Sequence, residues 1–467
     1  MPDPKDFGES FLNFMQTMNA AAPRQEAFFP TLLTKHFKAD AEHLPIVTYR
    51  FAGYEHPSVQ RALDELASQE RAAGRDMEVI GVTTDHKRYN IPDLASLISS
   101  GDGGMRAPRP GPVEYRTADL GDGGTIACVQ CGLVLMRPNN TPIAAMFNGP
   151  NEFGRSAGVG VDVMAPTRED AERFLTMLRS RVHALSVYRG HALSIHQERF
   201  SPDLKLVFHK LPTISRNDII LPAAILDRIE RQTVSFSRHA AALSDAGRHL
   251  KRGVLLHGPP GTGKTLTAMY LATQMTGRTV LLATGYGHGM LEHACAVARA
   301  LQPATIVLED VDLIAEDRET AQSCATPLLF ELLNQMDGLA EDADILFVLT
   351  TNRPQALEVA LSARPGRIDQ AIEVPLPDDE CRRRLIALYS RGVTLKLTNL
   401  DSVIARTKGA SASFIKELLR RATLLACIEG RGSVIEDRDV DEALHELVIS
   451  GGLLTRKILG FEESAAR

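Results

Sequence analysis

The stretch GPPGTGKT, Gly258 to Thr265, predicts a phosphate-binding loop. It follows a strand-like run, Gly253 to Leu256, and opens a helical stretch, Leu266 to Met275. Glycines let backbone N–H groups surround phosphate oxygens, and the N-terminus of the helix adds partial positive charge. Lys264 is expected to reach the β and γ phosphates, and Thr265 to offer its hydroxyl to Mg²⁺. The predicted nucleotide-binding residues are Gly258, Pro259, Pro260, Gly261, Thr262, Gly263, Lys264, Thr265 and Leu266.

Two acidic residues follow a second apolar run some forty residues further on. The segment ATIVLEDVD places Glu309 and Asp310 just beyond the end of this predicted strand. Acids at this position beside a phosphate loop suit the binding of Mg²⁺ and the polarisation of an attacking water. We therefore predict Glu309 as a metal ligand and Asp310 as the residue on the water side. A charged strand end that faces solvent remains the alternative.

Polar residues also end a third apolar run, ILFVLTTNRP. Asn352 is predicted to fix the attacking water through a neutral amide. In the following ARPGRID, Arg364 and Arg367 lie on a loop, where a guanidinium can stabilise charge on a transferred phosphoryl group. For Arg367 alone, a surface salt bridge is an equal alternative.

These motifs, in this order, resemble an AAA+ ATPase of the AAA family proper, over about Ser215 to Leu444. The resemblance implies ATP and Mg²⁺ as cofactors, ATP hydrolysis and a homo-oligomeric ring, usually of six subunits. It also implies that Arg364 and Arg367 reach into the neighbouring subunit's site. The stretch TKGASASFIKELLRRA, Thr407 to Ala422, resembles the family's second conserved helix start. By this analogy the adenine base is lined by Gly409, Ala412 and Ser413 on one side and by Asp218 and Ile219 on the other.

The predicted fold class is α/β. Strand-like runs at 253–256, 279–284, 304–308 and 345–350 alternate with helical stretches, which favours a parallel sheet with helices on both faces. The expected organisation is a mostly helical region, an α+β domain for client recognition, a large α/β ATPase subdomain, a small helical lid and a tail, over residues 1–99, 113–210, 211–377, 378–450 and 451–467. A stretch rich in Gly and Pro separates the first two.

Three features qualify the resemblance. Most family members have the acidic pair as Asp-Glu, whereas the order Glu309-Asp310 resembles the mitochondrial AAA translocase of the Rieske protein and its soluble bacterial relatives. Threading unfoldases carry an aromatic pore loop where this chain has GYGHG, Gly285 to Gly289, so Tyr286 is either a displaced pore aromatic or part of a Gly-rich turn. His445-Glu446 lacks the second His of a zinc protease motif, which argues against an AAA protease.

Composition limits the remaining possibilities. The chain has 467 residues, 44% of them hydrophobic and 24% charged, with a net charge of −6, as expected for a soluble globular protein without a nucleic-acid-binding field. No apolar run approaches the ~18 to 20 residues that span a bilayer, and the first ten residues lack a signal pattern, so we expect a cytoplasmic protein without a membrane span. Cys128 and Cys131 are either half of a zinc or redox site or, as we favour, two ordinary strand cysteines.

Two functions fit these features. The first is an ATP-driven ring that remodels or chaperones protein clients. The alternative is a nucleotide-dependent scaffold or regulatory switch with slow ATP hydrolysis, favoured by the Glu309-Asp310 order and the short connection at Tyr286. A DNA-directed role ranks third because the sequence shows no basic face.

Overall fold

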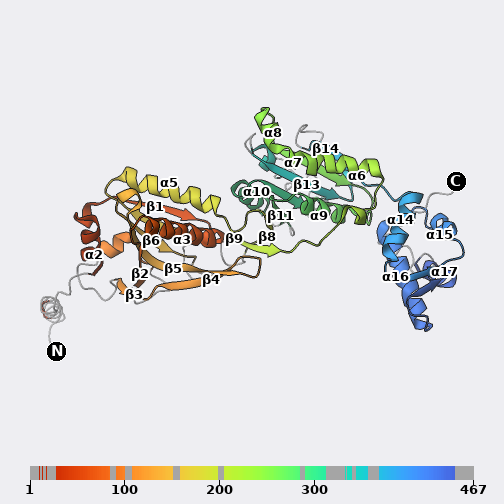
Figure 1. Ribbon diagram of the computed structural model, residues 1–467, viewed down its shortest axis with the longest axis horizontal. Helices are drawn as coiled ribbons and strands as arrows, with labels where there is room; N and C mark the ends of the chain where they lie inside the picture. The colour runs from red at the N-terminus through yellow and green to blue at the C-terminus, as the bar shows by residue number, and fades with distance from the viewer. Residues whose placement is uncertain are drawn as a thin grey trace. The chain divides into compact units, whose positions relative to one another are not determined.

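The structure is a computed structural model of the 467-residue chain. It describes residues 28–84, 91–99, 108–150, 158–197, 204–283, 290–311, 334–338, 343–355 and 368–447, with Ser10, Asn13, Thr17 and Leu332. The chain forms two compact units (Figure 1). Unit 1 comprises Met1–Val187 with Gln197–Lys205, and unit 2 comprises Tyr188–His196 with Leu206–Arg467.

Unit 1 is built on a seven-stranded antiparallel sheet. Its strand order is β1-β7-β6-β5-β2-β3, and β4 also pairs with β5. The strands are β1 (Ile46–Phe51), β2 (Glu78–Thr83), β3 (Arg109–Gly111), β4 (Glu114–Asp119), β5 (Thr125–Met136), β6 (Ile143–Asn148) and β7 (Val159–Met164). The strand β1 therefore lies at one end of the sheet.

Helices cover both faces of this sheet. Because strand residues point alternately to opposite faces, Val159, Val161 and Val163 of β7 pack with α3 (His56–Ala72) and α5 (Arg168–Ala184). On the other face, Met164 packs with α2 (Phe28–Phe37) and α4 (Leu94–Ile98). Each helix contributes apolar side chains to one of two separate cores, so unit 1 is a three-layer α/β/α structure.

The predicted division into a mostly helical region, 1–99, and an α+β domain, 113–210, does not match the structure. Strands β1 and β2, from the first range, pair with β7 and β5, from the second. A lone strand cannot satisfy its backbone groups, so β1 and β2 complete the sheet of the other segment. Near the end of the second range, β8 (Ala192–Gln197) belongs instead to the sheet of unit 2, where it pairs in parallel with β11 (Thr279–Ala283).

Unit 2 contains a second seven-stranded sheet, of order β14-β10-β13-β12-β11-β8-β9. The pairs from β14 through to β8 are parallel, as the sequence predicts for this region. Its strands are β8, β9 (Leu204–His209), β10 (Arg252–His257), β11 (Thr279–Ala283), β12 (Ala304–Leu308), β13 (Ile345–Thr351) and β14 (Gln370–Glu373). The chain order of the strands differs from their spatial order, so crossover segments must connect them.

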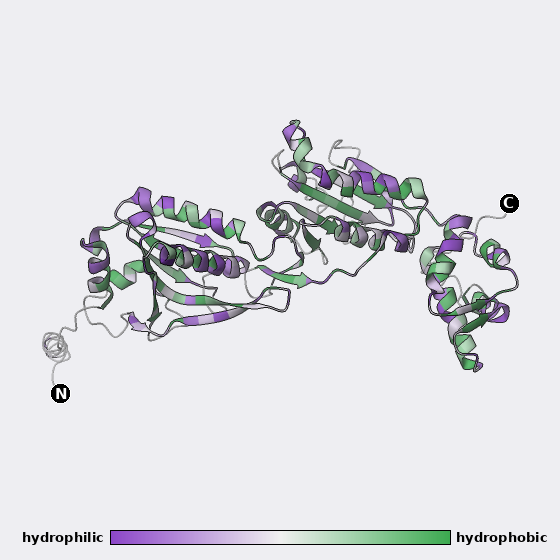
Figure 2. Cartoon of the chain, in the orientation of Figure 1, coloured by the Kyte–Doolittle hydropathy of each residue, from purple (hydrophilic) through white to green (hydrophobic). Residues whose placement is uncertain are grey.

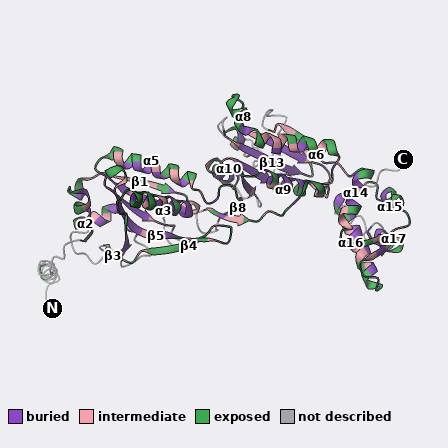
Figure 3. Ribbon diagram, in the orientation of Figure 1, coloured by how far each residue is buried: buried purple, intermediate pink, exposed green. Residues whose placement is uncertain are grey.

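Every residue of β12 and β13 is buried, which requires cover on both faces of the sheet (Figure 3). Figure 2 shows the hydrophobic character of this sheet. One core joins α6 (Ala223–Glu230) and α9 (Lys264–Gln274) to alternate residues of β10 and β13. The other helices of this part are α7 (Phe236–Arg238), α8 (Ala240–Asp245) and α10 (Met290–Ala300). The resulting α/β architecture confirms the predicted fold class.

The last described part of the chain is a small helical subdomain, here called the lid. It contains α14 (Asp379–Tyr389), α15 (Leu400–Arg406), α16 (Ala412–Ile428), α17 (Asp437–His445) and the two short parallel strands β15 (Thr394–Lys396) and β16 (Val434–Glu436). Its helices share one apolar core around Phe414 and Leu418, both fully buried.

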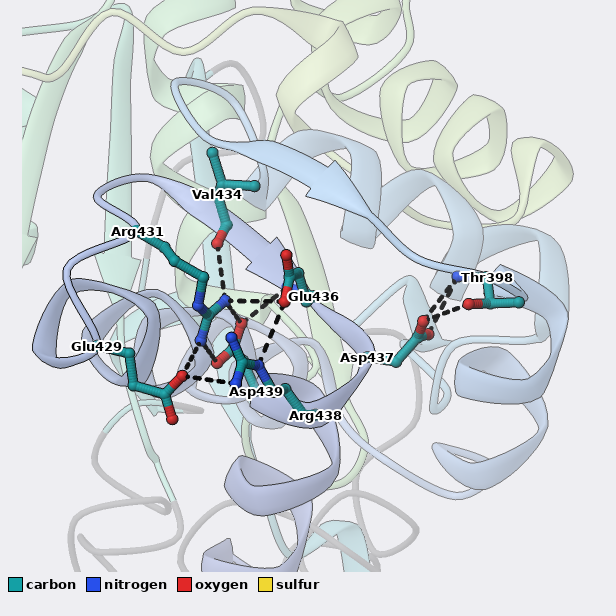
Figure 4. Close-up of polar contacts among 8 residues, drawn as sticks. All are labelled: Thr398, Glu429, Arg431, Val434, Glu436, Asp437, Arg438 and Asp439. Carbon is teal, nitrogen blue, oxygen red and sulfur yellow. Dashed lines mark hydrogen bonds and ion pairs between the residues drawn. The ribbon is translucent and has the colours of Figure 1, made fainter.

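Arg431 links the end of α16 to β16 and α17 (Figure 4). The two terminal nitrogens of Arg431 contact the two carboxylate oxygens of Asp439 at 2.5 and 2.6 Å. Arg431 also contacts Glu429 at 2.8 Å and the carbonyl of Val434 at 3.3 Å. Asp439 is 2% exposed, so a paired guanidinium is needed to keep its charge inside the lid.

The two strand cysteines, Cys128 and Cys131, contact different carbonyl groups. The Cys128 thiol lies 3.8 Å from the carbonyl of Ile126, whereas the Cys131 thiol lies 3.5 Å from that of Val82. Burial raises the pKa of Cys128 to about 11. Across the described ranges, no three His, Cys, Asp or Glu side chains cluster to hold a metal ion. Within the same ranges, no helix has the length and hydrophobicity required to cross a bilayer.

Candidate active site

The phosphate loop lies where β10 ends, as predicted. Gly258 passes so close to the neighbouring chain that a Cβ there would lie 2.2 Å from the carbonyl oxygen of Val374. Gly263 begins α9 with a φ of 99°, a left-handed conformation that favours glycine. These constraints explain why the loop needs glycine at both places, and they direct the N-terminus of α9 toward the loop.

Lys264 holds its charge inside the loop. Its side chain is buried, with 5% of the residue exposed, and Nζ donates hydrogen bonds to the carbonyls of Gly258 at 2.9 Å and Pro259 at 2.8 Å. The Thr262 hydroxyl donates to the carbonyl of Pro259 at 3.0 Å. Two loop carbonyls therefore hold the ammonium group at the loop, where it can serve as the cationic partner of phosphate oxygens.

Thr265 and Glu309, the two predicted magnesium ligands, lie together. Burial raises the pKa of the Glu309 carboxyl, the charge of Asp310 adds to the rise, and a hydrogen bond with the Thr265 side chain opposes it. A carboxylate made unfavourable in this way gains from a nearby cation. Hydroxyl and carboxylate oxygens are ligands that Mg²⁺ accepts together with substrate phosphates, so this pair fits the ion.

Asp310 and Asn352, predicted on the water side, are hydrogen-bonded to each other. The side-chain amide nitrogen of Asn352 donates to Oδ1 of Asp310 at 2.9 Å. Asp310 has a φ of 46°, and its N–H donates to the Thr350 hydroxyl at 3.0 Å. Few residues other than glycine adopt this left-handed conformation, although aspartate and asparagine do so more readily than most. The strand end is therefore bent so that the carboxylate meets the amide of the adjacent strand.

The lid contacts the phosphate loop at one of the predicted adenine-side residues. The N–H and hydroxyl of Ser413 donate to the carbonyl of Gly261 at 3.1 and 3.3 Å. Ala412 is buried at the start of α16, and Gly409 precedes it with a φ of 80°. The contact brings α16 to the loop although more than 140 residues separate them in the chain.

Asp218 and Ile219 lie at the turn η4 (Arg216–Asp218). The Asp218 carboxylate accepts hydrogen bonds from the N–H and hydroxyl of Ser215, and one of 3.0 Å from Arg391 at the end of α14. Ile219 is buried in the core of the ATPase sheet. Asp218 thus links the segment before α6 to the lid.

The match to a protein-family model identifies this part of the chain. Residues 254–376 match the model described as "ATPase family associated with various cellular activities (AAA)". The chain carries an AAA ATPase domain. The domain is an ATP-hydrolysing enzyme unit, and its matched region includes the phosphate loop, Glu309, Asp310 and Asn352.

Relatives of this AAA ATPase domain occur in several kinds of protein. A 26S proteasome regulatory subunit 6B homolog of Aspergillus niger is 35% identical over 43% of this chain and 50% of its own length. A proteasome-activating nucleotidase of Thermococcus onnurineus is 30% identical over 53% of this chain and 65% of its own length. The ATP-dependent zinc metalloprotease FtsH of Mycoplasmopsis pulmonis is 32% identical over 50% of this chain and 34% of its own length. The chain thus spans less than two thirds of each of these relatives.

Some predicted residues of the AAA domain lie outside the described ranges. These are Arg364, Arg367 and the GYGHG segment with Tyr286. Pro260 and Leu266 lie within the described ranges and are exposed, Leu266 by 41%. Sequence reasoning missed Thr350, which holds the backbone of Asp310, and Arg391, which holds Asp218. The Thr-Thr pair before Asn352 is a local signal for Thr350, but no local signal marks Arg391 because its partner is 173 residues away.

Proposed function

We propose that this protein uses ATP hydrolysis to remodel protein clients. The observation that carries the proposal is the hydrogen bond between Asp310 and Asn352 at the edge of the sheet that bears the phosphate loop. It supports a carboxylate that is held in place to orient water. The similarity of the ATPase domain to proteasome regulatory and proteasome-activating ATPases supports protein clients.

The proposed site assigns a role to each group of residues. Thr265 and Glu309 hold Mg²⁺, which neutralises charge on the phosphates when bound. Lys264 and the backbone N–H groups of the loop bind the phosphates, and Asp310 with Asn352 positions the attacking water. The base lies between Gly409, Ala412 and Ser413 on one side and Asp218 and Ile219 on the other.

The proposed assembly is a homo-oligomeric ring of six subunits in the cytoplasm. In that ring, Arg364 and Arg367 complete the site of the neighbouring subunit, and nucleic acid is not a partner. The order Glu309-Asp310 supports a relation to the translocase of the Rieske protein and its soluble bacterial relatives.

The test is a nucleotide-trapped variant. Asp310→Asn removes the charge but keeps a residue that tolerates the left-handed backbone, so it should bind ATP and hold clients without hydrolysing. Proteins that co-purify with this variant in ATP are identified by mass spectrometry and compared with those from Lys264→Ala, which should not bind ATP. Equal recovery from both variants would contradict client remodelling.

The order of the acidic pair also favours a second function, a nucleotide-dependent switch with slow hydrolysis. Asp310 is one methylene shorter than the Glu usual at this place, so its carboxylate reaches less far toward water. The two functions differ in one measurement: ATP turnover stimulated severalfold by unfolded protein supports remodelling, whereas turnover that does not respond supports the switch.

A further inference from the structure

A hollow opens on one face of the sheet of unit 1. It has a volume of about 340 Å³, within the range of small ligand sites. Its lining includes Thr48 and Arg50 of β1, Asn148 of β6, Gly160 and Asp162 of β7, and Asp93 before α4. All of these residues belong to the unit that precedes the ATPase part of the chain.

The register of three strands explains the hollow. Residues that pair across β1, β7 and β6 form rows on this face. In the first row, Met164 of β7 lies between Ile46 of β1 and Ala144 of β6. This row is apolar and lies in the core under α2 and α4. Two rows further along β7, Gly160 lies between Arg50 and Asn148. Between these rows, Asp162 lies between Thr48 of β1 and the buried Met146 of β6, so the face becomes polar one row earlier on β1 and β7 than on β6.

Gly160 leaves the floor of the hollow empty. A Cβ at this position would have Asn148 Cβ at 3.8 Å as its nearest neighbour, which is ordinary contact. A side chain would therefore fit, and packing does not demand glycine here. The open space is a property of the residue at 160 and can be removed without moving the backbone.

Hydrogen-bond acceptors dominate the polar lining. Asp162 accepts from the Thr48 hydroxyl at 2.8 Å and from the N–H of Leu94 at 3.4 Å. The Asn148 amide nitrogen donates to the carbonyl of Pro92 at 2.9 Å, and its Oδ1 is buried without a hydrogen-bond partner among the described residues. The lining includes two carboxylates, Asp93 and Asp162, and one guanidinium, Arg50; Asp93 also caps α4 by accepting from the N–H of Ser96 at 2.7 Å. A ligand that brings positive charge and N–H donors complements this lining.

The hollow borders the end of the sheet. β1 is the last strand in the sheet order, and no described strand pairs with its outer edge. By contrast, the edge of β5 at Val129 is closed by side chains of α3, since His56 contacts its carbonyl at 2.8 Å and Gln60 accepts from its N–H at 2.9 Å. An extended segment added to β1 would direct alternate side chains over the face that carries the hollow.

We propose that the hollow beside β1 binds a basic side chain of an extended polypeptide segment that pairs with the edge of β1. The segment belongs to a client, so this inference rests on the proposed remodelling function and adds the recognition site and its chemistry. Backbone pairing with β1 supplies affinity for any extended chain. The carboxylates Asp93 and Asp162 select lysine or arginine at the position level with Arg50 and Gly160, from which a long side chain crosses β1 to the hollow.

The test uses the full chain and two fluorescein-labelled octapeptides, one alternating Thr and Lys and one alternating Thr and Glu. Fluorescence anisotropy should show the Lys peptide binding at least about tenfold more tightly than the Glu peptide. Gly160→Val fills the hollow with a residue suited to strands and should weaken Lys-peptide binding about tenfold or more. The matched control is Thr117→Val, at an exposed position of β4, which should leave binding within about twofold.

A second variant distinguishes loss of the binding site from a folding defect. Asp162→Asn keeps the shape of the side chain and an acceptor for Thr48, and it should lower Lys-peptide affinity about fivefold to tenfold with an unchanged melting curve. Equal binding of the two peptides, unchanged binding by Gly160→Val, or full competition by free lysine amide would each overturn the proposal. If client capture by Asp310→Asn persists in the Gly160→Val background, only the recognition site is wrong and the remodelling function stands.

Discussion

The side-chain amide of Asn352 donates a 2.9 Å hydrogen bond to the carboxylate of Asp310, across the ends of two adjacent parallel strands. The pair joins residues that are 42 positions apart in the chain. Its position beside the phosphate loop makes it the centre of the proposed hydrolytic site.

Asn352→Ala should lower ATP turnover while ATP binding changes little, because the amide orients the carboxylate and does not hold phosphate. We expect a loss of about 10²-fold or more in the rate of the chemical step. Single-turnover hydrolysis and equilibrium binding of ATP separate the two effects. A variant that loses binding and turnover in equal proportion would show that Asn352 acts on the nucleotide itself.

Thr265→Val should raise the concentration of Mg²⁺ needed for tight ATP binding, because valine keeps the shape of threonine but lacks the hydroxyl that meets Glu309. We expect a shift of about tenfold or more in the Mg²⁺ dependence, measured by calorimetric titration. The control is Thr273→Val in the same helix, whose hydroxyl bonds to the carbonyl of Tyr270 away from the loop. Identical Mg²⁺ titrations for the two variants would exclude Thr265 as a ligand.

Lys264→Met should abolish tight ATP binding without large loss of stability. The ammonium is buried and held by two loop carbonyls, and methionine replaces it with an apolar chain of similar length. We expect affinity for ATP to fall by about 10²-fold or more, read from equilibrium binding of a fluorescent ATP analogue. Retained affinity together with a normal melting curve would contradict the assignment of Lys264 to the phosphates.

Arg278→Met should destabilise the ATPase sheet at the ends of its strands opposite the phosphate loop. Arg278 is almost fully buried and contacts the carbonyl of Ala304 at 2.5 Å and the carboxylate of Asp344 at 2.6 Å. Loss of this paired cation should cost about 2–4 kcal/mol, seen as a lower melting temperature by calorimetry. The exposed pair Arg383–Asp401 provides the control, since Arg383→Met should leave the melting temperature nearly unchanged. An equal fall in melting temperature for Arg278→Met and Arg383→Met would show that burial does not make the Arg278 pair more stabilising than the exposed pair.

The lid should lose stability in acid. Hydrogen bonds from Arg431 hold the pKa of Asp439 below its usual range, and those from Arg420 and Arg421 lower the pKa of Glu417 to about 2. Because the folded-state pKa values lie below the unfolded ones, the stabilisation is complete above about pH 5 and is lost as pH falls, in the case of Glu417 toward its folded-state pKa of about 2.

The measurement is acid unfolding followed by circular dichroism. Asp439→Asn should be less stable than the natural chain at pH 7, and the difference should shrink as pH falls. Asp401→Asn, at a carboxylate that is 75% exposed, is the matched control and should show little change at any pH. A constant difference between Asp439→Asn and the natural chain across this range would rule out the Asp439 charge as the cause.

Much of the ATPase part could be predicted from the sequence because its strands are short apolar runs that alternate with helical stretches. The range predicted for β12 matches the observed Ala304–Leu308, and the loop between β10 and α9 lies where GPPGTGKT predicts it. Buried parallel strands form continuous apolar runs, so their ends are visible in the sequence. Since parallel strands end at one edge of a sheet, the meeting of the polar residues that follow them could be expected as well.

The first hundred residues were harder to predict. The run Pro45 to Arg50 predicts a strand close to the observed β1, whereas β2, a six-residue strand with mixed burial, alone resembles a connection between helices. Only pairing with β7 and β5 makes them strands of one sheet, because those partners satisfy their backbone groups. The hollow over Gly160 depends on the same long-range register.

The sequence by itself determined the phosphate loop, the acidic strand end and the α/β class, because these depend on local residue types and periodicity. Tertiary structure alone decided which groups bond to one another: Thr265 to Glu309, Asn352 to Asp310 and Ser413 to Gly261. Those contacts join segments about 40 to 150 residues apart, and their geometry comes from the register of the sheet and the packing of the lid. The loop GPPGTGKT thus predicts nucleotide binding, whereas the arrangement around it provides the groups for hydrolysis.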